Sequence, residues 1–100
     1  MSTLHVLSHS PFGDERLTSC LRVIGANDGL LLSGDAAYAL QPGTAPFTAL
    51  SERSEHGLKL FVLTEDAQAR ALAVPDWARA IDYPAFVELS IHYDKVNSWL

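Results

Sequence analysis

Cys20 is the only cysteine of the chain and the side chain with the most evident capacity for covalent chemistry. A reactive thiol needs a lowered pKa and access to solvent. The helix predicted to carry Cys20 begins about nine residues earlier, so its dipole does little to activate the thiol. Cys20 shares an apolar stripe with Leu17, Leu21 and Ile24, which favours a buried position. Two interpretations stay open: a core residue, or a nucleophile supported by Arg16 if both side chains face solvent.

The four histidines, His5, His9, His56 and His92, show no spacing typical of metal ligands. His5 falls in a predicted strand and is expected in or near the core. His9 lies at the corner after that strand, where an exposed loop residue is the favoured interpretation and a functional residue the alternative. His56 and His92 are expected at the surface or at helix ends. No residue is assigned to a metal site.

Glu65 and Asp66 are adjacent carboxylates that directly follow a predicted strand. Paired carboxylates can act as general acid and base when their pKa values are pushed apart. Nothing in the flanking sequence indicates such a difference, whereas acidic residues in a first helical turn stabilise the helix dipole. The sequence also lacks the glycine-rich patterns of dinucleotide-binding and P-loop proteins, so no nucleotide cofactor is expected.

The elements that must position these side chains begin with an N-terminal corner. Residues 3–8 form a short apolar run, which predicts a strand. Ser10 is expected to cap a helix whose first residue is Pro11, and Gly25 to end that helix in a left-handed conformation. Strand-to-helix corners of this kind are where α/β folds usually place their chemistry.

Strands and helices are predicted to alternate along the rest of the chain. Asp28-Gly29 indicates a turn, Asp35 and Thr64 are expected to cap helices, and the tail 94–100 shows no regular pattern. Trp99 in this tail is expected to dock on its own domain or on a partner subunit. The predicted strands are residues 30–32, 58–63 and 79–82, and the predicted helices are residues 36–40, 46–57, 65–72 and 84–93. This alternation predicts a mostly parallel sheet with helices on both faces.

Length and charge limit the functional classes. One hundred residues, 48% of them hydrophobic, are expected to form a single domain over residues 1–100. The net charge of −5 argues against direct binding of nucleic acid or of an anionic membrane surface. No apolar run is long enough to span a bilayer, and the N-terminus lacks the features of a signal peptide. A lone cysteine fits a reducing compartment, so a cytoplasmic location is expected.

Several short segments together carry a family resemblance. Their order and spacing, together with the chain length, make the chain similar over nearly its whole length to the TusB/DsrH-like family of sulfur-relay subunits. The segments are Leu4-His5, Ser10-Pro11-Phe12, Leu30-Leu31-Leu32, Leu63-Thr64-Glu65-Asp66, Ala69-Arg70, Ile81-Asp82-Tyr83, Phe86-Val87 and Trp99.

The resemblance implies a small Rossmann-like, three-layer α/β/α domain. It also implies assembly with TusC-like and TusD-like subunits as a dimer of heterotrimers, without a cofactor. Such a complex passes persulfide sulfur from a TusA-like donor to a TusE-like acceptor for 2-thiolation of the wobble uridine in tRNA. The main sulfur-carrying cysteine of the family belongs to the TusD-like subunit, so the resemblance implies a largely structural role for this chain.

The alternative concerns Cys20. Some DsrH-like relatives in sulfur-oxidising bacteria have a cysteine in the first helix, where Cys20 falls. The resemblance therefore also allows an active sulfur carrier that uses Cys20 as its persulfide site. A third possibility is a stand-alone α/β domain that binds an unknown ligand. An isolated chain with exposed partner surface is expected to be able to form homo-oligomers.

Overall fold

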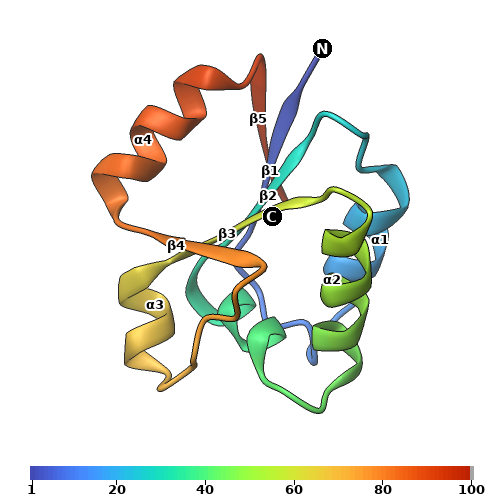
Figure 1. Cartoon of the computed structure of the whole chain (residues 1–100), viewed down its shortest axis with the longest axis vertical. Helices are drawn as coiled ribbons and strands as arrows, with labels where there is room; N and C mark the ends of the chain where they lie inside the picture. Colours follow the sequence, from blue (N-terminus) through green and yellow to red (C-terminus); the bar gives the residue numbers. More distant parts are fainter. Residues whose placement is uncertain (100) are drawn as a thin grey trace.

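Five parallel strands form one sheet in the order β4-β3-β2-β1-β5 (Figure 1). The computed structural model describes residues 1–99. The strands are β1 (Thr3–Leu7), β2 (Gly29–Leu32), β3 (Lys59–Leu63), β4 (Ala78–Ile81) and β5 (Lys95–Trp99). The predicted parallel α/β sheet is confirmed, with one strand more than predicted.

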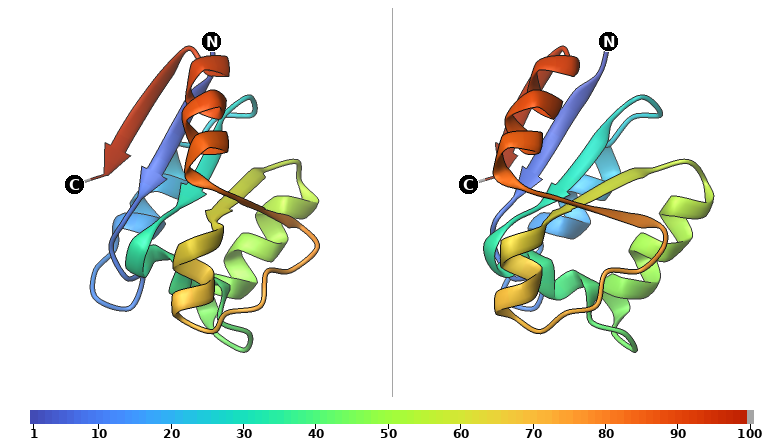
Figure 2. Two further views of the ribbon diagram at one scale, coloured as in Figure 1. Left: turned by 90° about the vertical axis from the view of Figure 1, so that its left-hand side faces the viewer. Right: turned by 60° about the vertical axis from the view of Figure 1, so that its left-hand side comes forward.

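Helices cover both faces of this sheet (Figures 1 and 2). On one face lie α1 (Arg16–Val23), α2 (Ala45–Glu55) and the 3₁₀ helix η1 (Gly34–Leu40), beside the short α3 (Thr64–Ala69). The opposite face is covered by α4 (Tyr83–His92). None of the helices within residues 1–99 is long and apolar enough to cross a membrane.

The central strand β2 shows why the sheet forms. Its residues Gly29–Leu32 are all buried, as expected for a parallel strand that is covered on both faces. Leu30 and Leu32 pack toward α1 and α2, whereas Leu31 packs toward α4. Each face of the sheet therefore has its own hydrophobic cluster.

The prediction for the N-terminal corner was wrong in its details. The helix begins at Arg16, so Pro11 is not its first residue. The Oγ atom of Ser10 accepts the N–H of Phe12 at 3.2 Å, and the Ser10 carbonyl accepts the N–H of Gly13 at 3.2 Å. Ser10 therefore closes a turn rather than capping a helix, and residues 8–15 form a loop between β1 and α1.

Gly25 and Gly29 also play roles other than those predicted. The backbone of Gly25 is outside the left-handed region, and its N–H donates to the Asp28 carboxylate at 2.8 Å. Gly29 is the first residue of β2 instead of part of a turn. A β-carbon at Gly29 would collide with the hydroxyl of Tyr93, so close packing requires glycine at this position.

Most predicted elements differ from the observed ones by one to three residues at their ends, and the differences at η1, α3 and β4 have clear local causes. Asp35 and Thr64 lie inside the first turns of η1 and α3, so neither is an N-cap. The helix predicted for residues 65–72 ends at Ala69, because Leu72 turns back and donates its N–H to the carbonyl of Ala67 at 2.9 Å. The strand predicted for residues 79–82 stops at Ile81, because Asp82 caps α4.

The C-terminal tail forms β5, which the sequence did not predict. Its residues pair in parallel with β1, from Thr3 opposite Lys95 to Leu7 opposite Trp99. Four of its five residues are exposed, so β5 has no continuous apolar run that would mark it as a strand. Pairing with β1, 92 residues away in sequence, is a tertiary effect.

Candidate functional site

Cys20 lies on the sheet-facing side of α1 and is 0% exposed. The stripe predicted from the spacing is present: Leu17 is buried with Cys20, and Leu21 and Ile24 pack against the same cluster. A hollow of about 580 Å³ between α1 and α2 is lined by Leu17 and Leu21 but not by Cys20. A sulfur donor therefore has no open route to the thiol.

The surroundings of Cys20 also oppose ionisation. Burial raises the pKa of the thiol to about 12, with a smaller contribution from the Asp28 carboxylate, while Arg53 acts in the opposite direction. At neutral pH the side chain is a thiol, which is a poor nucleophile. Arg16 does not assist, because its guanidinium pairs with Asp14.

His9 and Ser10 lie in the loop after β1, at the carboxyl end of the sheet where α/β folds often bind ligands. His9 is exposed, and its Nδ1 atom lies 3.4 Å from the Oγ of the adjacent Ser8. This confirms the interpretation of His9 as an exposed loop residue. Cys20 is not part of this loop, because it lies on the buried side of α1.

Asp66 and Arg70 form a structural cluster at the same edge. Asp66 accepts the N–H of Gly34 at 2.8 Å, and Arg70 donates from Nη2 to Asp35 at 2.8 Å. The guanidinium of Arg70 also lies 5.6 Å from the centre of the Tyr38 ring. These contacts tie α3 to η1, and the adjacent carboxylates Glu65 and Asp66 lie in the first turn of α3, as predicted.

A buried polar chain links β1, the segment before β2, and β5. Trp99 donates from Nε1 to Nδ1 of His5 at 3.1 Å, and Nε2 of His5 lies 3.2 Å from Oδ2 of Asp28. Because an indole nitrogen can only donate, Nδ1 of His5 accepts and Nε2 carries the proton toward Asp28. His5 is 5% exposed, which confirms its predicted core position.

Asp28 is the member of this hydrogen-bonded set that the sequence analysis missed. Besides His5, it accepts the backbone N–H groups of Thr3 and Gly25, each at 2.8 Å. Burial alone would raise its pKa, but the hydrogen bonds from Gly25, Thr3 and His5 outweigh burial and lower it. The Asp-Gly pair resembled an ordinary turn, so no local signal marked this role.

The remaining histidines are separated from one another. Nδ1 of His56 lies 2.9 Å from the carbonyl of Glu52 at the end of α2, and His92 is the exposed last residue of α4. Within residues 1–99, no three histidine, cysteine or acidic side chains form a group that could hold a metal ion.

Comparison with protein families gives one match over most of the chain. The model described as "DsrH like protein" matches residues 9–96. A protein named TusB from Erwinia tasmaniensis is 35% identical over 98 residues, which cover 96% of this chain and 99% of that protein.

Two solved structures share the fold. The ychN protein from E. coli superposes with a TM-score of 0.77 at 19% identity, over 99% of this chain and 100% of that chain. A protein of unknown function from Methanobacterium thermoautotrophicum superposes with a TM-score of 0.73 at 9% identity, over 98% and 97% of the two chains.

Proposed function

The chain belongs to the DsrH-like family, and from this we propose that it is a mainly structural subunit of a bacterial sulfur-relay complex. The proposed unit is a single DsrH/TusB-like domain over residues 1–100. It acts in the cytoplasm beside TusC-like and TusD-like subunits, in a dimer of heterotrimers. The complex moves persulfide sulfur from a TusA-like donor to a TusE-like acceptor for thiolation of the wobble uridine in tRNA.

The burial of Cys20 supports the structural role more than any other observation. The side chain is 0% exposed and its pKa is raised to about 12. A persulfide carrier must present a thiolate to the persulfide of its donor and later present its own persulfide to the thiolate of its acceptor, and both steps need access. In the proposed complex, the sulfur-carrying thiol therefore belongs to another subunit.

Co-expression with the sister subunits tests the proposal. The three chains are expected to co-purify as one complex, and deletion of this chain is expected to abolish thiolation of the wobble uridine. Thiolation would be measured by mass spectrometry of digested tRNA. An intact thiolation level in the deletion strain would contradict the proposed role.

Cys20→Ala separates the structural role from the alternative of an active carrier. The variant complex is expected to assemble and to support thiolation at the wild-type level. After incubation of the wild-type complex with a persulfide donor, only a sister subunit should gain the mass of a sulfur atom. Loss of thiolation in an assembled Cys20→Ala complex, or a mass gain on Cys20, would establish the carrier role instead.

A further inference from the structure

Helix α4 is apolar on its outer side as well as on the side that faces the sheet. Ala85, Phe86 and Leu89 pack against the cluster beneath it. The opposite side carries Tyr83, Val87 and Ile91, which are 60%, 46% and 77% exposed. We call these three residues the α4 ridge. A surface helix normally carries polar residues on its outer side, so three large apolar residues there indicate that the ridge lacks a covering element.

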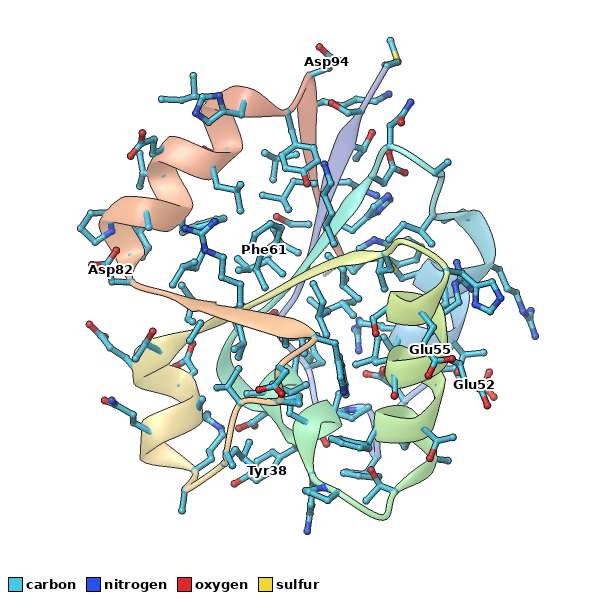
Figure 3. All side chains as sticks on the ribbon, viewed as in Figure 1. Tyr38, Glu52, Glu55, Phe61, Asp82 and Asp94 are labelled. Carbon is cyan, nitrogen blue, oxygen red and sulfur yellow. The ribbon has the colours of Figure 1, made fainter. Side chains whose placement is uncertain are left out.

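A groove runs beside α4, over the half of the sheet formed by β3 and β4. Two adjoining hollows, of about 820 and 230 Å³, share the lining residues Phe61, Arg79, Leu89 and His92, which we call the α4 groove. The side chain of Phe61 lies on the side of β3 that faces α4 (Figure 3). Within residues 1–99, α4 is the only helix that packs on this face, and it buries Phe61 of β3 and Ile81 of β4 but leaves Arg79 of β4 exposed.

Arg79 places a positive charge in the groove, beside the partly exposed Leu89. It pairs with Phe61 in the register of β3 and β4, and it is exposed. Asp76 and Glu88 also line the hollows, but no carboxylate within residues 1–99 lies within 4.0 Å of the Arg79 guanidinium. A guanidinium beside apolar side chains is suited to bind a carboxylate that arrives with an apolar segment.

We propose that the α4 groove binds a helix of a sister subunit, which packs apolar side chains on the partly exposed Leu89 and places a carboxylate against Arg79. The same partner extends over the α4 ridge. A stable interface buries roughly 800 Å² on each partner, which three ridge side chains do not supply without the groove. The inference rests on the proposed function, because it names the surface through which the complex assembles.

A sister subunit fits this surface better than a second copy of the chain. The ridge and the groove are different surfaces, so identical copies that placed ridge against groove would form a heterologous contact that does not close into a dimer. Each copy also carries a net charge of −5, which opposes self-association. A different subunit can occupy the groove without leaving a further copy of the same contact open.

Two charge-introducing variants with matched controls test the proposal. Arg79→Glu reverses the groove charge, and Arg22→Glu makes the same change at an exposed site on α1. Ile91→Glu places a charge on the ridge, and Val23→Glu does so at a comparably exposed apolar residue of α1. Each full-length variant is mixed with the purified sister subunits. Its affinity for them is measured by native mass spectrometry and by binding to immobilised sister subunits. Circular dichroism melting verifies that all four variants are folded.

The expected result is at least a tenfold loss of affinity for Arg79→Glu and Ile91→Glu, with both controls at the wild-type value. If the wild type assembles and all four variants bind equally well, the proposed function stands and this surface is wrong. A wild-type chain that forms homodimers through this surface, while the sister subunits bind elsewhere, overturns the choice of occupant. Failure of the wild type to bind any sister subunit overturns the proposed function as well.

Discussion

Cys20 shows how position decides the chemistry of a side chain. The residue type permits nucleophilic catalysis, but the thiol packs between α1 and the sheet, and burial raises its pKa to about 12. Its spacing from Leu17, Leu21 and Ile24 already indicated the inward-facing stripe. The spacing carried no information about Asp28 and Arg53, which act on Cys20 across the fold.

The raised pKa of Cys20 predicts a loss of stability in alkali. The folded state holds the thiol proton up to about pH 12, whereas the ordinary pKa of a free thiol is 9.0. The stabilising contribution of the protonated thiol is therefore complete below pH 9.0. As the pH rises from 9.0 toward about 12, the free energy of unfolding falls by roughly 1 kcal/mol per pH unit. Urea unfolding of the wild type and Cys20→Ala between pH 7 and 11 measures this difference. If the free energy of unfolding changed with pH in the same way for both proteins, the raised pKa of Cys20 would be contradicted.

Asp28 predicts the opposite dependence, in acid. Its pKa is lowered from the ordinary aspartate value of 3.8, so its contribution to stability is present above that value and is lost as the pH falls through the lowered pKa. Asp28→Asn is expected to reduce the free energy of unfolding by about 1–3 kcal/mol at neutral pH. The difference from wild type should shrink below pH 3.8. Unfolding in urea measures it, with the exposed Asp76→Asn as control, and a difference independent of pH would contradict the assignment.

At the scale of elements, β5 depends on a side-chain contact as well as on strand pairing. The strand lies at the sheet edge with four exposed residues, and its one partly buried side chain, Trp99, bonds to His5 of β1. The sequence indicated that Trp99 docks, and the structure shows that the dock is its own sheet. The loop of residues 8–15 illustrates the reverse case, because strong local helix signals at Ser10 and Pro11 were overridden by a turn.

Trp99→Phe tests this anchor. Phenylalanine keeps an aromatic ring at the site but removes the indole donor, so Nδ1 of buried His5 loses its partner. The expected loss of stability is about 1–3 kcal/mol, together with faster hydrogen exchange of the β5 amides. Trp77→Phe is the matched control, because Trp77 makes an edge contact with Phe47 that another aromatic ring can replace. Equal effects of the two substitutions would show that the His5 bond contributes nothing specific.

At the scale of the whole molecule, the two faces of the sheet are covered unequally. One face carries α1, α2, η1 and the short α3, whereas within residues 1–99 the other face carries α4 alone (Figure 2). The α4 groove lies beside this helix. An unequally covered sheet is a natural place for another subunit to supply a missing layer. The net charge of −5 directs such contacts toward proteins rather than polyanions.

This charge predicts that the isolated chain does not bind tRNA. Nucleic-acid binding relies on basic side chains that neutralise phosphates, and only seven are spread over the chain. Fluorescence anisotropy with labelled tRNA at physiological salt should therefore show no saturable change, with a basic RNA-binding domain as positive control. A salt-dependent binding curve would contradict a role limited to protein partners.

The sequence by itself determined the elements with strong local patterns. Each of these elements is marked by residues that are close together in the sequence. They are the leucine run of β2, the apolar stripe on α1, and Pro84 at the start of α4. The alternation of these elements was enough to predict a parallel sheet with helices on both faces.

Only the tertiary structure decided the features that join distant segments. Neither the strand character of β5 nor the hydrogen-bonded chain Trp99–His5–Asp28 has a local signal, because the partners are separated by 23 to 94 residues. The inaccessibility of Cys20 and the groove beside α4 likewise depend on how helices pack on the sheet. Local spacing sets which side of an element is apolar, whereas packing decides which apolar side stays uncovered.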